Sequence, residues 1–204
     1  MNVKQTFFRG LCLSLLLLLA ACSAVPLRSL WSLRQFELSQ LDAAQLRLPV
    51  YLPAHLGAAR DAVKLTLRAE RGNPAQEVLE ETLTLRPAAD GAVPAGLQPP
   101  RAGGHWLVLV LDGAEQQRLN QLRSRMLAWK ATDGSSAKRR MGMEAHPQLC
   151  TRGARSPADP AELRLSAWVR WQAGQADLLL LDDAGLKDLP GEVLAQPLPP
   201  CPAG

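Results

Sequence analysis

The chain has 204 residues, of which 47% are hydrophobic and 21% are charged, and its formal net charge is +4 at pH 7. These values fit one globular domain that is long enough to bury a core of its own. The positive excess is too small to indicate a nucleic-acid partner, so that class of function is excluded.

The first predicted element is an export signal. Lys4 and Arg9 form a basic head without any acidic residue, and residues 11–19 are rich in leucine. A short basic head before an apolar run of about 7–15 residues is typical of such a signal. The alternative is an uncleaved transmembrane helix over residues 10–27, which is near the threshold length of about 18 residues but contains Pro26.

The apolar run ends in Leu19-Ala20-Ala21-Cys22, where small side chains precede a cysteine. This motif resembles the lipobox of bacterial lipoproteins. The resemblance implies a signal peptide over residues 1–21, cleavage before Cys22, and acylation of Cys22 with several chains such as palmitate. More than one acyl chain gives firm attachment to a membrane. By the same resemblance, Ser23 implies the periplasmic face of the outer membrane, with the inner membrane as the alternative.

The rest of the chain divides into a tether and a body. Residues 22–29 are expected to form the lipidated anchor and a short tether, and residues 30–204 a single globular domain that faces the periplasm. This domain begins with Leu30-Trp31-Ser32-Leu33 and continues through a Leu-Arg-Leu-Pro type strand in residues 46–53. Both features are similar to those of uncharacterised proteobacterial lipoproteins, and the similarity implies no activity.

The cysteines predict one disulfide. Cys12 leaves with the signal and Cys22 carries lipid, so Cys150 and Cys201 remain as a pair in an oxidising compartment. A bridge between them would tie the proline-rich tail to the domain. The alternative is a redox or metal site, but neither cysteine has another cysteine at the two-residue spacing that such sites use.

Four segments alternate between apolar and polar residues, which is typical of half-buried strands: residues 45–52, 62–71, 77–86 and 163–171. Pro49 cannot donate to a ladder, so the first of these strands is expected at a sheet edge or at a bulge. The turn formers Gly72-Asn73-Pro74-Ala75 predict a hairpin between the second and third strands. Residues 87–104 are expected to be a long loop.

Residues 106–111 are continuously apolar, and residues 177–182 contain four leucines in a row, so both segments predict strands buried on both faces. The later one is expected to form a hairpin with residues 163–171. Residues 141–145 predict a weak strand, and residues 151–161 a loop. Asp182-Asp183 is interpreted as a turn, with acid–base work or cation binding as the alternative.

One helix is predicted after the first buried strand. Asp112 and Glu115 have the spacing of a capping box, and an apolar stripe runs to about residue 131 through Leu119, Leu122, Met126 and Trp129. Seven or eight strands without intervening helices predict an α+β fold with a mainly antiparallel sheet. A β-sandwich with a helical insertion is the alternative.

The sequence offers no catalytic constellation. His55, His105 and His146 are far apart and show no metal-binding spacing, so no metal, cofactor or catalytic residue is predicted. A possible basic contact surface is formed by Arg118, Arg123, Arg125, Lys130, Lys138, Arg139 and Arg140. Such a surface suits an anionic membrane or polymer or an acidic partner, and the alternative is a solvated face.

A second contact candidate is Trp168 between Arg164 and Arg170, unless another element covers it. The leading functional hypothesis is a membrane-anchored envelope lipoprotein without enzymatic activity, which binds an envelope protein or an anionic envelope polymer or supports an assembly. One alternative is a lipid or lipoprotein carrier, in which the inward faces of the strands line an apolar cavity. The other is an envelope hydrolase that acts on a peptide, glycan or lipid.

Overall fold

Seven strands and one long helix dominate the residues that the structure, a computed structural model, describes: 40–72, 77–93, 95–133, 139–153, 163–185 and 198–202. The predicted signal peptide, Cys22, the tether and residues 30–33 lie outside them. The strands are β1 (Arg47–Pro53), β2 (Leu56–Arg71), β3 (Glu77–Pro87), β4 (Gly104–Leu111), β5 (Arg139–Thr151), β6 (Arg164–Val169) and β7 (Leu178–Gly185), and the helix is α3 (Gly113–Asp133).

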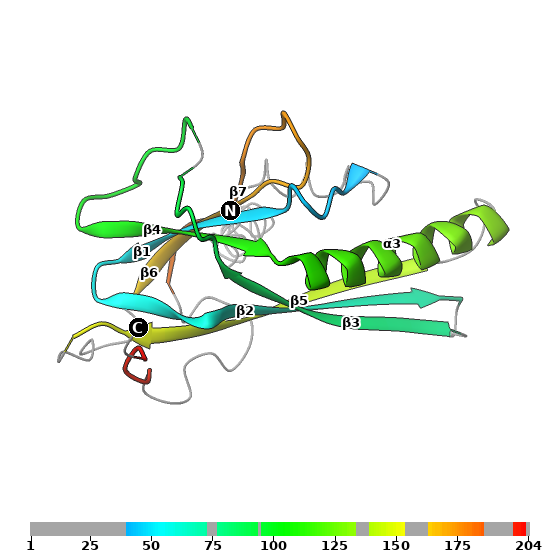
Figure 1. Cartoon of the computed structure of the whole chain (residues 1–204), viewed down its shortest axis with the longest axis horizontal. Helices are drawn as coiled ribbons and strands as arrows, with labels where there is room; N and C mark the ends of the chain where they lie inside the picture. The colour runs from blue at the N-terminus through cyan, green and yellow to red at the C-terminus, as the bar shows by residue number, and fades with distance from the viewer. Residues whose placement is uncertain are drawn as a thin grey trace, which may run out of the picture.

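All seven strands belong to one sheet with the order β5-β2-β3-β4-β1-β6-β7, and every neighbouring pair is antiparallel (Figure 1). The predicted α+β fold with a mainly antiparallel sheet is therefore confirmed. The alternative of a β-sandwich is wrong for the described residues, because their strands form a single hydrogen-bonded ladder system. The predicted hairpins β2–β3 and β6–β7 are both present.

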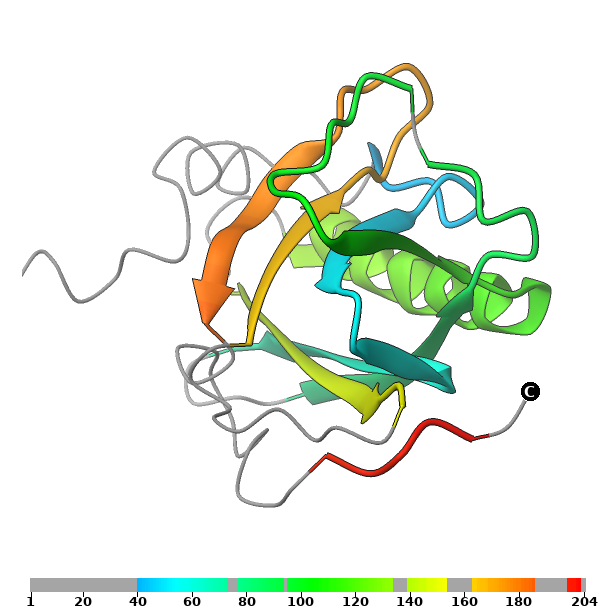
Figure 2. The same cartoon turned by 90° about the vertical axis from the view of Figure 1, so that its left-hand side faces the viewer.

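The sheet curls strongly, as Figure 2 shows with β7 in orange at the left and β5 in yellow-green across the bottom. Twist accumulates from strand to strand in any sheet. Irregular pairing in two places adds to it, between Ala58 and Val63 of β2 and in the part of β7 that pairs around Ala167 of β6. Because bulges bend the strand that carries them, the flat ladder becomes a concave surface, with β5 and β7 as its two edges.

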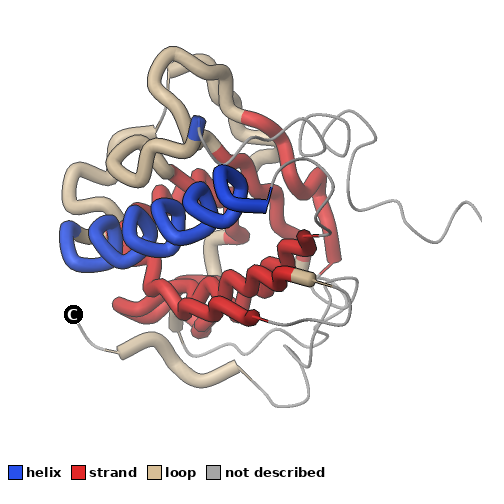
Figure 3. The backbone as a smooth tube through the Cα atoms, turned by 90° about the vertical axis from the view of Figure 1, so that its right-hand side faces the viewer, coloured by secondary structure: helices blue, strands red, loops and turns tan. Residues whose placement is uncertain are grey.

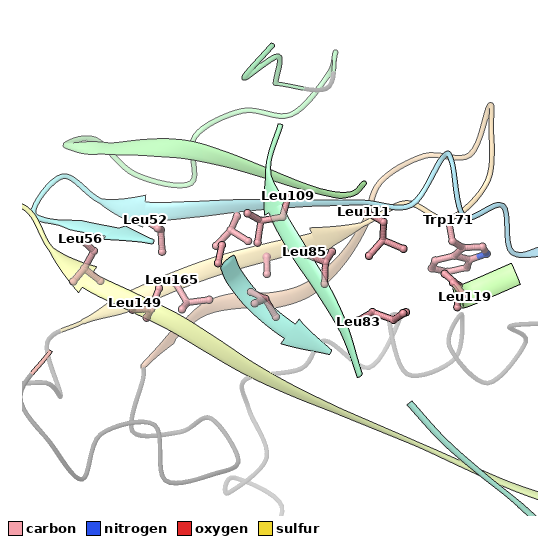
Figure 4. Close-up of a cluster of buried hydrophobic side chains, with 14 of the residues drawn as sticks. Leu52, Leu56, Leu83, Leu85, Leu109, Leu111, Leu119, Leu149, Leu165 and Trp171 are labelled. Atoms are coloured by element: carbon pink, nitrogen blue, oxygen red, sulfur yellow. The ribbon is translucent and has the colours of Figure 1, made fainter. Parts of the chain in front are cut away.

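The concave face carries the core (Figure 4). Leu52, Leu83 and Leu109 come from three different strands, and each is at most 1% exposed. Figure 3 shows the helix α3 in blue across the strands at one side of the molecule, and its contacts are with β3, with β4 and, through Ala69, with β2. The residues that meet there are Leu122, Trp129, Ala69 and Leu79. The other half of the concave face therefore has no helix over it among the described residues.

Only one of the two hydrogen bonds of the predicted capping box is present at the start of α3. The Glu115 N–H donates to Asp112 Oδ1 at 3.0 Å, as expected of an N-cap residue. The Glu115 carboxylate does not complete the predicted box, because it accepts a hydrogen bond from Arg118 at 3.1 Å. Asp112 also pairs with Arg86 of β3, so the cap joins the helix to the sheet.

The expectation that Pro49 marks an edge strand or a bulge in its own strand is wrong, because β1 lies between β4 and β6. Pro49 keeps its place in the β1–β4 register opposite Val108. On the other side, β1 pairs with β6 through Val50 and Tyr51, and the pairing resumes in the same register at Arg47 opposite Arg170. The missing proline N–H thus faces the interruption in the β1–β6 ladder, where no donor is needed.

Two expectations for residues 177–183 are corrected. Strand β7 is an edge strand, and its leucines are half-buried instead of buried on both faces. Asp182 and Asp183 lie within β7 and not in a turn. Asp183 has a positive φ of 46°, at the place where β7 changes register against β6. The Asp182-Asp183 pair that predicted a turn therefore belongs to an irregular strand. Turns and irregular strands both use residues that tolerate left-handed backbone.

A disulfide joins Cys150 to Cys201, the predicted pair, across a separation of 51 residues. The tail around Cys201 runs parallel to the end of β5, where Thr151 N–H donates to the Pro199 carbonyl and Cys201 N–H donates to the Thr151 carbonyl. The predicted weak strand over residues 141–145 is longer than expected, because β5 spans 13 residues. Its C-terminal end is held by the tail.

Candidate ligand-binding site

A cavity of about 120 Å³ opens in the half of the concave face that α3 leaves uncovered. Six of the seven strands contribute to its wall. The lining residues are Leu48, Val50, Leu52, Ala58, Ala62, Val63, Leu107, Leu109, Ala145, Pro147, Leu149, Leu165, Ala167 and Leu181. All of them are apolar, so the cavity can hold an apolar group and offers it no hydrogen-bond partner from these side chains.

The period of two in each strand places these side chains together. Alternate residues of a strand point to the same face, so Leu48, Val50 and Leu52 of β1 all face the cavity. The register places Leu52 opposite His105 and Val50 opposite Leu107 of β4. In Figure 4, Leu52, Leu149 and Leu165 point from three different strands towards the same space.

The cavity lies between the two edges of the sheet. Ala145, Pro147 and Leu149 come from β5, whereas Leu181 comes from β7 at the opposite end of the strand order. An engineered apolar cavity of about 150 Å³ in another protein stays dry and binds benzene. A cavity of this size and composition therefore fits a segment of hydrocarbon chain of similar volume to benzene. The curl of the sheet determines the width of the cavity.

Small inward residues create the space. Ala58, Ala62, Ala145 and Ala167 occupy wall positions where the neighbouring inward residues are mostly leucine or valine. Interiors are normally packed to about the density of organic crystals, and a methyl group in place of an isobutyl group leaves a volume unfilled. These four alanines at inward positions are the feature of the sequence that could have indicated the cavity.

His105 lies on the cavity side of β4, two residues before the lining residue Leu107. Both of its ring nitrogens are shielded from solvent, and neither has a hydrogen-bond partner among the described residues. Burial, and to a lesser degree the positive charge of Arg152, lowers the pKa of His105 from its ordinary value of 6.5. The imidazole is therefore neutral at pH 7, and this part of the concave face carries no charge from it.

The residues of the predicted basic surface that the structure describes differ in exposure and in partners. Arg118 is paired with Glu81 of β3 at 2.7 Å and with Glu115 at 3.1 Å. Arg125, Lys130 and Arg140 are exposed. Lys138 lies outside the described residues, as does the side chain of Arg139.

Helix geometry separates the four cations of α3. At about 100° per residue, Arg118 and Arg125 lie on one side of the apolar stripe, whereas Arg123 and Lys130 lie on the other. The ion pair with Glu81 directs the first side towards β3. Arg123 lines a small hollow together with Met141 of β5, which directs the second side towards β5. The four cations of α3 therefore lie on two sides of its apolar stripe, and the basic contact surface remains a prediction.

Trp168 lies on the convex face and is half-buried in an aromatic cluster. Its ring centroid is 5.0 Å from that of Trp106, which is 5.2 Å from that of Tyr51. The flanking arginines are engaged as well, Arg164 with Asp183 at 2.7 Å and Arg170 with Asp177 at 2.8 Å. Trp168 thus packs against Trp106 of β4, and both flanking arginines are engaged in ion pairs.

The loop before β4 contacts this cluster at Tyr51. Tyr51 Oη donates a hydrogen bond to the Arg101 carbonyl at 2.6 Å and accepts one from the Gly104 N–H at 3.0 Å. The Arg101 guanidinium lies 5.8 Å from the centre of the Tyr51 ring and also pairs with Asp183. On the convex side, the loop is therefore fastened to β1 through Tyr51 and to β7 through Asp183.

The other two histidines stay apart. His55 and His146 are exposed at separate places, and the described residues contain no group of three His, Cys, Asp or Glu side chains that could hold a metal ion. Within the described ranges, no helix combines the length and the apolar character needed to cross a bilayer. Comparison of the chain with protein-family models, curated proteins and solved structures found no match.

Proposed function

We propose that the protein is a lipid-anchored envelope protein that holds the acyl chain of a lipid in the concave face of its curled sheet. The observation that supports this proposal is the cavity of about 120 Å³, whose lining side chains are all apolar. Of the hypotheses that the sequence allows, the carrier needs such a cavity. A hydrolase needs acid, base or nucleophilic side chains at its site, and the lining residues contain none.

The cavity and the predicted anchor support the same role. Acylation of Cys22 would keep the domain beside a membrane, and the tether of residues 22–29 is short. Each methylene group removed from water contributes about 0.8 kcal/mol, so a site that buries a few of them can compete for part of a lipid chain. A binding site open between two sheet edges lets such a chain enter without unfolding the core.

The direct test is photo-crosslinking of the full-length protein in membranes with palmitate that carries a diazirine at its methyl end. Labelled peptides are identified by mass spectrometry, and we expect them to come from β1 and β6. Two variants at neighbouring positions of β5 provide the comparison. Ala145→Trp should fill the cavity, because Ala145 lines it and is exposed at its rim. Glu144→Trp places the same ring on the opposite, exposed face of the strand.

Loss of labelling in Ala145→Trp but not in Glu144→Trp is the expected result. Equal labelling of both variants, or labelling of the wild type only at surface peptides of the convex face, would overturn the proposal. Circular dichroism of both variants checks that each one keeps its fold.

The anchor is tested by intact mass and membrane fractionation of the full-length protein beside Cys22→Ser. The wild type should carry the added mass of acyl chains and partition into detergent, whereas the variant should do neither. Identical behaviour of the two proteins would contradict the lipid anchor and leave the cavity to be interpreted without a membrane.

A partner-binding or assembly role is the second candidate, and one observation favours it. Strand β5 is an edge strand, and among the described residues the tail pairs with it near Thr151. Unpaired edges can accept an additional strand from a partner. Capture of partners from membranes by the wild type, but not by a variant with proline at the exposed position Glu144, would support this role.

A further inference from the structure

Two methionines on the inward face of β5 are exposed to an unusual degree. Met141 is 53% exposed and Met143 is 61% exposed, more than any other large hydrophobic side chain among the described residues. Both belong to the same alternation as Ala145, Pro147 and Leu149, which line the cavity. The apolar wall of the cavity therefore continues along β5 beyond the cavity itself.

This strip has a regular geometry. Strand β5 pairs with β2 without a register change from Arg139 to Pro147, and the irregularity at Ala58–Val63 lies in β2. At about 3.3 Å per residue, the distance from Leu149 to Met141 along the strand is roughly 26 Å. The strip is thus long and narrow, which is the shape of an extended hydrocarbon chain.

The helix supplies a second wall at the far end of the strip. Leu119, Leu122 and Met126 of α3 and Met141 of β5 line a hollow of about 20 Å³. Its other lining residues are Leu67, Arg68, Ala69 and Arg123. Leu67 lies opposite Met143 in the β2–β5 register, so the hollow, the two methionines and the cavity follow one another along the same face of the sheet.

We propose that this strip is a groove for a long acyl chain whose methyl end lies in the cavity. The groove runs from Leu149 through Met143 and Met141 to the hollow beside α3, and it holds the part of the chain nearer the carboxyl group. The inference rests on the proposed function and adds a selectivity for chain length. A cavity of about 120 Å³ accommodates only the end of a palmitoyl chain. The remainder needs an apolar surface that leads away from it.

Methionine suits this position. Its unbranched, polarizable side chain adapts to ligands of different shape, and such residues are common at promiscuous apolar surfaces. Val78, the next most exposed large hydrophobic residue at 43%, lies one position from the inward residue Leu79 and so faces the convex side. It provides a control residue of matched exposure outside the groove.

The test uses full-length protein in membranes and two photoreactive palmitates, one with the diazirine at the methyl end and one with it near the carboxyl group. The first should label β1 and β6, and the second should label the β5 peptide that contains Met141 and Met143. Unlabelled octanoate and palmitate are then used as competitors of the methyl-end label, in wild type, Met141→Gln/Met143→Gln and Val78→Gln.

We expect palmitate to compete about tenfold less well in the double methionine variant than in the wild type, because several methylene groups lose their apolar contact. Octanoate should compete equally in both, since it reaches only the cavity. Val78→Gln should behave as the wild type with both competitors.

The outcomes separate this inference from the proposed function. If the methyl-end label reaches β1 and β6 but the double methionine variant does not change competition by palmitate, the groove is wrong and the cavity proposal stands. If the methyl-end label fails to reach the cavity, the proposed function itself is wrong. If the double methionine variant changes the molecular mass of the protein in solution from dimer to monomer, the methionines form a contact between two copies, and the groove is again wrong.

Discussion

His105 is an imidazole held on the apolar side of the sheet, which gives the stability of the protein a specific pH dependence. The folded state disfavours its charged form, so its pKa is lower than the ordinary value of 6.5. As the pH falls below about 6.5, the unfolded chain takes up a proton that the folded chain does not, and the free energy of unfolding decreases. Above that pH both states are neutral and this contribution vanishes.

We predict that His105→Phe reduces the loss of stability between about pH 8 and about pH 5, as measured by denaturant midpoints. At about pH 8 the variant should be as stable as the wild type or more stable, because two nitrogens without a partner are removed. His146→Phe, at an exposed position of β5, serves as the control. An unchanged pH dependence in His105→Phe would show that the ring is hydrated or paired in solution.

Asp183 combines a strained backbone with two ion pairs. It is the only residue other than glycine with positive φ among the described residues. Its carboxylate pairs with Arg101 and Arg164, and its N–H donates to Ser166 Oγ at 2.9 Å. Left-handed backbone costs most residues about 1–2 kcal/mol, and Asn and Asp tolerate it better.

We predict that Asp183→Ala lowers the free energy of unfolding by about 1 kcal/mol more than Asp183→Asn does. The asparagine variant loses only the charge, and partly exposed ion pairs contribute about 0–1 kcal/mol. Equilibrium denaturation of the three proteins gives both differences. Equal stabilities of the two variants would mean that the backbone at this position relaxes.

At the scale of elements, the helix cap provides the clearest test. Asp112 accepts the Glu115 N–H and also pairs with Arg86. We predict that Asp112→Ala lowers the free energy of unfolding by about 1 kcal/mol, whereas Asp112→Asn, which keeps a side-chain oxygen for the cap, loses less. The comparison is made by thermal and denaturant unfolding. If both variants lose the same amount, the pair with Arg86 matters more than the cap.

The elements themselves follow largely from local patterns. The alternation of β2 and β3, the apolar run of β4 and the stripe of α3 are visible in the sequence because each depends on a short period. The length of β5 is not visible, since Gly142, Pro147 and the exposed methionines weaken its pattern. Strand β5 forms because β2 offers it a long partner. The prediction for β1 was wrong at Pro49 because the β1–β6 ladder is interrupted at the position where proline lacks a donor.

At the scale of the molecule, the cavity is a property of the curl and not of any single strand. The sequence predicts which face of each strand points inward. The same inward residues are compatible with a filled core and with a cavity that they line. The difference lies in where Ala58, Ala145 and Ala167 meet, which depends on the strand order and on the bulges at Ala58–Val63 and Ala167. These are long-range features. The ion pair of Arg118 is a long-range feature as well, since its partner Glu81 lies 37 residues away.

The disulfide acts on the whole molecule because it fastens the C-terminal tail to the edge strand that borders the cavity. Cys150 is 2% exposed, and Thr151 beside it exchanges hydrogen bonds with the tail. A bridge across 51 residues restricts the unfolded chain, and loop-closure entropy for that length corresponds to about 4 kcal/mol. Opening the bridge therefore destabilises the protein even where the folded contacts survive.

We predict that Cys150→Ala/Cys201→Ala lowers the free energy of unfolding by up to about 4 kcal/mol, as measured by denaturant unfolding. Reductant should produce a comparable loss in the wild type and none in the variant, which controls for the loss of the side chains themselves. Because Leu149 and Pro147 of the same strand line the cavity, the variant should also label less with the methyl-end palmitate. Full labelling despite lower stability would mean that β5 keeps its place without the tail, and that the sheet alone determines the shape of the cavity.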